Sequence, residues 1–322
     1  MNAFADDRKP LVILAAVVLV LAIALFLRGI GSLDLILFSI LQYFATIGPV
    51  ALGLGLTMIA REFDISVGST MSLAGCVAVI VGQRDPNLGA LAGIATGVAV
   101  GFLQGVLVTG LGLSSISVSL GALITLAGLS YVVTGNQTIS LNHADITQAI
   151  NAPIGSVFSV RSLFAIGCFA AAGVVVALTR VGAELTATGS DRVAAATAGV
   201  RVNRVVVVVF MLSGGLSAAS GVFLSYGLSV ASPSGLTDVL VPAISAAIVG
   251  GVALTGGRGS PVGIACGALT LCTLNAGLNA LGVSPTMQQI ILAGVLFTVA
   301  VVAAPRLNRI WMRRTQNGGG AL

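Results

Sequence analysis

The stretch LILFSILQYFATIGPVALGLGLTMIA, residues 35–60, contains no charged side chain. As a helix rising 1.5 Å per residue it would measure roughly 39 Å, whereas the hydrocarbon core of a bilayer is about 30 Å thick. A helix of about 20 predominantly apolar residues is enough to cross a membrane. The stretch therefore predicts a transmembrane helix.

The rest of the chain has the same character. Of its 322 residues, 57% are hydrophobic and only 8% are charged, where a soluble domain carries about 25% charged residues. So few charges exclude a soluble globule, and such high apolar content excludes disorder. We predict an all-α polytopic membrane protein. Apolar runs between polar breaks predict ten transmembrane helices, near residues 11–27, 35–60, 65–82, 89–111, 116–134, 162–179, 205–228, 239–254, 260–280 and 286–304.

The basic residues indicate how the chain is oriented. If the N-terminus lies in the cytoplasm, twelve of the 15 lysines and arginines fall on inner segments, and only Arg28, Arg84 and Arg161 fall on outer ones. Cytoplasmic loops are enriched in basic residues, so both termini are expected to be cytoplasmic. The excess of arginine reflects topology in a lipid bilayer, and no nucleic-acid partner is expected.

No catalytic arrangement is present in the sequence. His143 is the only histidine, Lys9 is the only lysine and follows no glycine loop, and no GxSxG or GxxxxGK[ST] motif occurs. The four cysteines lie in apolar runs without metal-ligand spacing. We therefore expect a protein that is not an enzyme, with no metal site and no cofactor of its own.

The polar groups inside the predicted spans are almost all uncharged. Such groups suit a translocation path for a neutral, hydroxyl-rich solute, although hydrogen bonds between helices explain any single one of them better. The lack of buried acids argues against proton coupling, and we interpret Asp64 as a cap of the third span. The amides in question are Gln42, Gln104, Asn275, Asn279, Gln288 and Gln289.

Glycines recur at intervals of four in the fourth span, which favours close helix packing. A shift of 170 residues aligns part of this ladder with a second glycine series and gives nine identities over residues 89–126. Two interpretations stay open: an inverted repeat of the kind found in transporters, or a likeness between glycine-rich helices. The two series are Gly89, Gly93, Gly97, Gly101 and Gly105, and Gly259, Gly263 and Gly267.

Several short motifs occur in a fixed order along the chain. FDISVGS at 63–69 and AAATAGVRVNR at 194–204 are followed by AAIVGG at 246–251, GGRGS at 256–260 and NAGLNALGVSP at 275–285. Together they resemble the permease subunits of ribose-type bacterial ABC sugar importers. Each motif alone is a weak glycine-rich string, whereas their order and spacing cover most of residues 45–300.

The resemblance implies one transmembrane permease domain over 1–322 in the bacterial inner membrane, with a periplasmic loop at 135–161 and a basic cytoplasmic tail at 305–322. It also implies a second permease copy or homologue, a cytoplasmic ATPase that uses ATP and Mg²⁺, and a periplasmic sugar-binding protein. Loop 180–204 would couple to the ATPase through a short helix near 191–199. The residues implied in this coupling are Asp191, Arg192, Ala194, Ala195, Gly199, Arg201 and Arg204.

The chain departs from the family pattern at several positions. Arg192 stands where many members carry a glutamate, so a salt bridge there is expected to need an acidic residue of the ATPase. Arg61-Glu62 replaces a common Gly-Gly, and Leu240 and Pro242 replace acidic residues. The implied function is import of a monosaccharide or polyol driven by the partner ATPase. The alternative is an ion-coupled secondary transporter of a small neutral solute.

Overall fold

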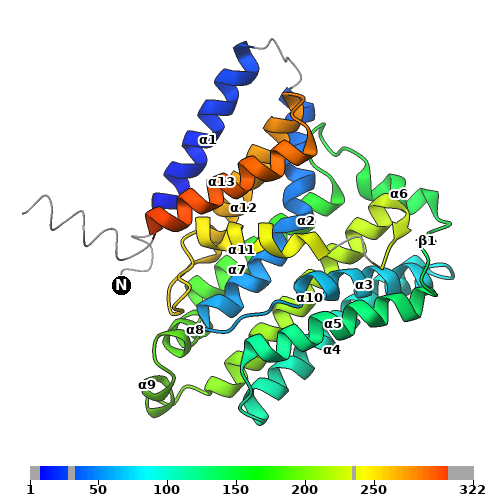
Figure 1. Cartoon of the computed structure of the whole chain (residues 1–322). Coiled ribbons are helices and arrows are strands. Elements are labelled where there is room, and N and C mark those ends of the chain that lie inside the picture. Colours follow the sequence, from blue (N-terminus) through cyan, green and yellow to red (C-terminus); the bar gives the residue numbers. More distant parts are fainter. Residues whose placement is uncertain (1–7, 28–32, 234–236, 304–322) are drawn as a thin grey trace, which may run out of the picture.

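The computed structural model describes residues 8–27, 33–233 and 237–303. Each of the ten predicted spans overlaps a helix (Figure 1). The predicted tail at 305–322 lies outside the described residues. The ten helices are α1 (Arg8–Leu27), α2 (Leu33–Ile59), α3 (Val67–Gly82), α4 (Pro86–Gly110), α5 (Ser115–Thr134), α7 (Val160–Leu178), α10 (Val202–Leu228), α11 (Leu240–Val249), α12 (Pro261–Ala280) and α13 (Pro285–Ala303).

An all-α polytopic membrane protein is confirmed. Six of the described helices, α2, α4, α5, α7, α10 and α12, are long and apolar enough to cross a bilayer. Helix α11 has ten residues and would measure only about 15 Å. The number of ten crossings therefore stays a prediction.

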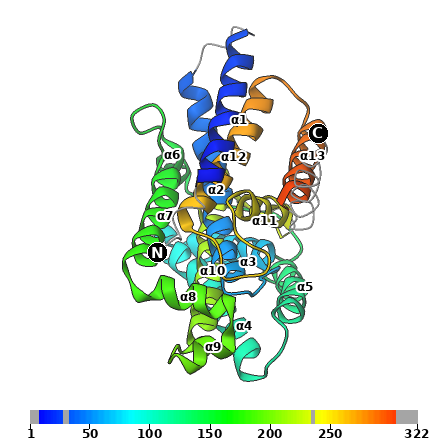
Figure 2. The ribbon, with the colours of Figure 1, turned by 90° about the vertical axis from the view of Figure 1, so that its left-hand side faces the viewer.

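The two hydrophilic loops contain short elements that the sequence analysis resolves only in part. Loop 135–161 holds β1 (Ile139–Ser140) and α6 (Ala144–Asn151), and loop 180–204 holds α8 (Arg180–Ser190) and α9 (Arg192–Thr197). Strand β1 pairs antiparallel with β2 (Val230–Ala231), which follows α10. Helix α9 precedes α10, whereas β2 follows it and pairs with β1 in the loop that contains α6. Helices α9 and α6 therefore lie at opposite ends of α10 and of the molecule (Figures 1 and 2).

Local sequence signals explain where α4 and α12 begin. The side chain of Asp85 accepts hydrogen bonds from the backbone N–H groups of Asn87 and Leu88, and Pro86 occupies the first helical position. Ser260 and Pro261 act in the same way at the start of α12. A capping side chain followed by proline is a common start of a helix, because proline lacks an N–H group that would be unpaired there.

Helix α10 packs against α2, α3 and α4 through small residues. A Cβ atom on Gly97 would lie 2.3 Å from the carbonyl oxygen of Gly214, and one on Gly101 would lie 2.1 Å from that of Phe210. The first glycines of the ladder, Gly89 and Gly93, face the carbonyl oxygens of α3 in the same way. The glycine ladder therefore lets three helix backbones touch.

The second glycine series lies against α11. A Cβ atom on Gly263 would lie 2.3 Å from the carbonyl oxygen of Gly250, and one on Gly267 would lie 2.1 Å from that of Ala246. Gly259 differs from the expectation, because it precedes α12 with a φ of +147° and faces the side chain of Ile59. It serves the turn into the helix rather than a helix face.

Candidate translocation cavity and coupling segment

A cavity of about 390 Å³ lies among α2, α11, α12, α13 and the 3-10 turn η1 (Thr237–Val239). Most of its wall is aliphatic, and its polar groups come from four residues. The lining residues are Ile47, Asp238, Leu240, Val241, Pro242, Ser245, Leu271, Asn275, Gln289, Leu292 and Ala293. Small-molecule sites typically have about 300–1,000 Å³ and combine apolar walls with a few polar groups, so this cavity has the size and chemistry of a ligand site.

Asn275 offers the cavity an unused hydrogen-bond acceptor. Its Oδ1 atom is buried and has no hydrogen-bond partner among the described residues. Ser245 donates its hydroxyl proton to the backbone oxygen of Val241, one turn earlier in α11, which leaves the Ser245 oxygen as an acceptor. Because buried polar atoms are rarely left unpaired, this oxygen requires a hydrogen-bond donor, such as a water molecule or a ligand hydroxyl.

The other amides predicted for the path lie elsewhere. Gln104 is buried and donates to Ser66 Oγ, and Gln288 donates to the backbone oxygen of Val283. Gln42 is partly buried with an unpartnered Oε1, and Asn279 is exposed. None of these four lines the cavity beside Asn275, whereas Gln289 does.

Asp238 is the one charged residue among the described residues that line this cavity, and the sequence patterns did not indicate it. It lies in η1, directly before α11, and its side chain is exposed. A carboxylate can accept hydrogen bonds from two adjacent hydroxyls. An acid immediately ahead of an apolar helix is the sequence signal that could have indicated it.

A buried segment between α2 and α3 joins several helices. The Oδ1 atom of Asp64 accepts hydrogen bonds from the backbone N–H and the hydroxyl of Ser66, and its Oδ2 accepts from Ser213 Oγ of α10 at 2.7 Å. Ser66 Oγ in turn accepts from Gln104 of α4. Desolvation raises the pKa of the Asp64 carboxyl, while the hydrogen bonds from Ser66 and Ser213 lower it. Ser66 holds the N-cap position of α3 and makes no side-chain cap hydrogen bond, whereas Asp64 accepts the backbone N–H of Ser66 just ahead of the helix. Asp64 thus supports the start of α3 from two residues before the N-cap, and it also binds α10.

Helix α5 holds the same segment from another side. Ser115 Oγ accepts the backbone N–H of Phe63, and Ser119 Oγ donates to the backbone oxygen of Phe63. The nonhelical backbone at Phe63 is thereby satisfied by side chains, as buried backbone groups require.

The segment also meets the loop predicted to contact an ATPase. Arg192, at the start of α9, forms an ion pair with Glu62. The side chain of Glu62 is 5% exposed and that of Arg192 is 43% exposed. The expectation that Arg192 needs an acidic partner outside the chain is therefore wrong. Both residues depart from the family pattern, and each supplies the charge that the other needs.

Helix α9 presents small side chains away from the helices that support it. Asp191 caps it by accepting from the N–H groups of Val193 and Ala194, and Gly199 follows its end with a φ of +88°. Val193 is 75% exposed, Ala194 is exposed, and Ala195 is buried. Arg201 and Arg204, which follow in the chain, are exposed as well. A partner could approach this helix closely.

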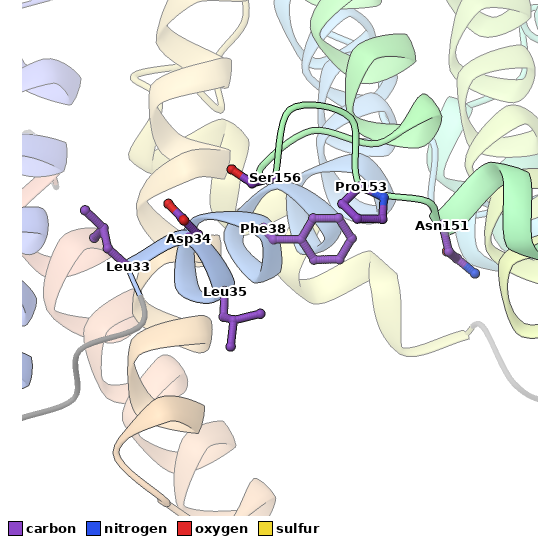
Figure 3. A pocket seen from close by; sticks show the side chains of 7 residues that line it. All are labelled: Leu33, Asp34, Leu35, Phe38, Asn151, Pro153 and Ser156. Atoms are coloured by element: carbon purple, nitrogen blue, oxygen red, sulfur yellow. The ribbon is translucent and has the colours of Figure 1, made fainter.

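A second cavity, of about 640 Å³, lies at the N-terminal end of α2, opposite the end that leads to Glu62 (Figure 3). The first turns of α2 form one side through Leu33, Asp34, Leu35 and Phe38, and the chain after α6 forms the other (Figure 3). Asn151, Pro153 and Ser156 line that other side. The cavity is open, and among the described residues Asp34 is the charged one that lines it.

A membrane domain with a solute-sized cavity among its helices and an exposed small-residue helix at one end has the features expected of a transport protein of the permease class. The chain matches the model of the family described as "Branched-chain amino acid transport system / permease component" over residues 36–300. It belongs to this family of membrane permeases.

Characterised relatives carry sugar specificities in their names. The chain is 34% identical to the ribose import permease protein of Escherichia coli (strain K12), over 83% of this chain and 84% of that protein. It is 29% identical to the fructose import permease protein of Rhizobium meliloti, over 91% and 83%. It is 28% identical to the L-arabinose ABC transporter permease protein of Azospirillum brasilense, over 80% and 76%. No solved structure matches the chain.

Proposed function

We propose that this chain is the inner-membrane permease subunit of an ATP-driven importer for a monosaccharide or a related polyol. The observation that carries the proposal is the cavity beside Asn275, because its polar groups suit a neutral solute rich in hydroxyls. The identity to the ribose, fructose and arabinose permeases supports the same substrate class.

The chemistry of the cavity also bears on the rival substrate named by the family description. A branched-chain amino acid carries an α-carboxylate, which needs a cation or several N–H donors when it leaves water. Among the described residues, the lining of the cavity includes no lysine, arginine or histidine, and the carboxylate of Asp238 is the one charge there. A sugar hydroxyl can donate to Asp238 and Asn275 without placing a second negative charge there.

The coupling part of the proposal rests on α9 and its ion pair. A cytoplasmic ATPase would dock on the exposed face at Val193 and Ala194, and Arg201 and Arg204 would add attraction to acidic groups. Movement of α9 would be transmitted to Glu62 through its ion pair with Arg192. From Glu62 it would pass along the chain to Phe63, which is hydrogen-bonded to α5, and to Asp64, which is hydrogen-bonded to α10. ATP and Mg²⁺ belong to the partner in this scheme, which gives the chain no cofactor of its own.

The complete importer would contain two permeases and a sugar-binding protein on the outer face. Loop 135–161 and the N-terminal end of α2 would face the periplasm. The open cavity there would offer the binding protein a mainly apolar contact surface with Asp34, Asn151 and Ser156 as polar groups (Figure 3). Loop 180–204 and both termini would then face the cytoplasm. The second permease would be either another copy of this chain or a homologue.

Reconstitution tests the proposal. The chain is placed in liposomes with the ATPase and the binding protein from its own gene neighbourhood, and uptake of labelled monosaccharides, polyols and leucine is measured. We expect sugar or polyol uptake that requires ATP and all three proteins. Uptake by the chain alone with an ion gradient and no ATP would instead identify a secondary transporter, and ATP-driven uptake of leucine without sugar uptake would overturn the substrate class.

A further inference from the structure

An apolar groove of about 440 Å³ runs along the outside of the helices at the α8 end of the molecule. Helices α7 and α10 both pack against α2, and the groove lies between them with the buried Leu52 and Leu56 at its floor. Its walls expose aliphatic side chains, among them Val175 at 42% and Val208 at 47%. Of the residues that line this groove, the transport scheme above uses only Arg204.

The dimensions of the groove match a single hydrocarbon chain. On α10 it extends from Arg204 to Leu216, which is roughly 18 Å at 1.5 Å per residue and close to the roughly 15 Å depth of one leaflet. The groove is partly open along its length, so an acyl chain of one leaflet can lie lengthwise against its aliphatic walls.

Two charged side chains lie at one end of this otherwise apolar groove. Arg204 is in the first turn of α10 and is exposed, while Glu184 of α8 is partly buried. Neither forms an ion pair with another described residue. Arginine pairs well with phosphate, and a carboxylate pairs with a primary ammonium group.

We propose that this groove is a binding site for a phospholipid with a phosphoethanolamine headgroup. One acyl chain lies between α7 and α10, Arg204 binds the phosphate and Glu184 binds the ammonium group. A lipid with an anionic headgroup and no amine would leave Glu184 unpaired beside a phosphate, so the pair of opposite charges favours the zwitterionic headgroup. The inference is independent of the transported solute.

Photo-crosslinking in bilayers tests the site. The chain is reconstituted with a phosphatidylethanolamine that carries a diazirine near the middle of one acyl chain, and the modified peptides are mapped by mass spectrometry. A phosphatidylglycerol with the same labelled chain serves as the comparison lipid. We expect the phosphatidylethanolamine to label residues 168–176 and 205–216 preferentially.

Variants separate headgroup recognition from simple exposure to lipid. Arg204→Gln should lower this labelling about tenfold, which is the effect of losing about 1.4 kcal/mol of binding. The matched control is Arg201→Gln, because Arg201 is exposed nearby but does not line the groove. Glu184→Gln should raise labelling by phosphatidylglycerol relative to phosphatidylethanolamine.

Filling the groove provides a second comparison. Ala172→Phe should abolish labelling in the groove, whereas Ala170→Phe should not, since Ala170 is exposed on α7 and does not line the groove. Three outcomes would each overturn the proposal. They are equal labelling by the two lipids, labelling spread evenly over other exposed helices such as α4, and crosslinks from Cys168 to a second copy of the chain.

Discussion

At the scale of single residues, two departures from the family pattern prove to be one feature. Glu62 and Arg192 are 130 residues apart in the sequence and form an ion pair at the start of α9. Removing one partner of a buried pair leaves the other charge uncompensated, which costs more than removing both.

We expect Arg192→Ala to lower the free energy of unfolding by about 1–2 kcal/mol, since water around the half-exposed arginine weakens the pair. The loss should be smaller when Glu62→Gln is added, because no buried carboxylate then remains. Thermal unfolding of the four proteins of this double-mutant cycle in one detergent measures the coupling. Purely additive effects would contradict the pairing.

Asn275 and Asn279 lie one turn apart on α12 and form a matched pair. Asn275 lines the cavity and Asn279 is exposed outside it. Asn275→Leu should lower the kcat/KM of transport about tenfold, which corresponds to a lost hydrogen bond of about 1.4 kcal/mol. Asn279→Leu should leave transport near the level of the unmodified protein. Equal effects in the uptake assay would remove Asn275 from the path.

At the scale of elements, sequence signals explain the helices better than they explain the cavities. The capped prolines Pro86 and Pro261 begin α4 and α12 close to the predicted boundaries. Helix α11 ends at Val249, five residues before the predicted end, because Gly250 and Gly251 turn the chain and Gly251 has a φ of +85°. The helix ends early because of the glycine pair, and this signal is easily missed because both glycines lie within an apolar run.

Gly97 provides a test of packing between elements. A methyl group there would overlap the carbonyl oxygen of Gly214, so Gly97→Ala should destabilise the protein by about 1–3 kcal/mol or prevent folding. Gly110 is on the same helix and has only Val106, at 4.0 Å, near the position of a Cβ atom. Gly110→Ala should therefore change the Tm little. Yield in detergent and Tm, measured side by side, decide the matter.

At the scale of the whole molecule, the sequence indicates a membrane domain but not which polar residues meet. Asn275 is recognisable as an amide in an apolar run, whereas Asp238 reaches the cavity only because η1 packs against α3 and α11 in the folded chain. The pairing of Glu62 with Arg192 likewise depends on how α2 and α9 approach each other. Contacts between distant segments are set by packing, which single-sequence patterns do not contain.

The orientation of the molecule leads to a labelling prediction. Thr197 on α9 and Gln148 on α6 are both exposed and lie at opposite ends. With Cys168 replaced by alanine, Thr197→Cys should react with an impermeant maleimide in inside-out vesicles only, and Gln148→Cys in intact spheroplasts only. The other three cysteines are buried and should contribute little. Reaction of both variants from one side would contradict the predicted topology.

The contact of Gly97 with Gly214 has a consequence for motion. The backbones of α4 and α10 leave no room for a methyl group, so the two helices cannot rotate or slide against each other without losing this contact. We therefore expect α4 and α10 to move as one rigid unit. If the protein opens first to one side of the membrane and then to the other, we expect this rigid pair to stay intact. The rearrangement would then occur in helices that are packed less tightly.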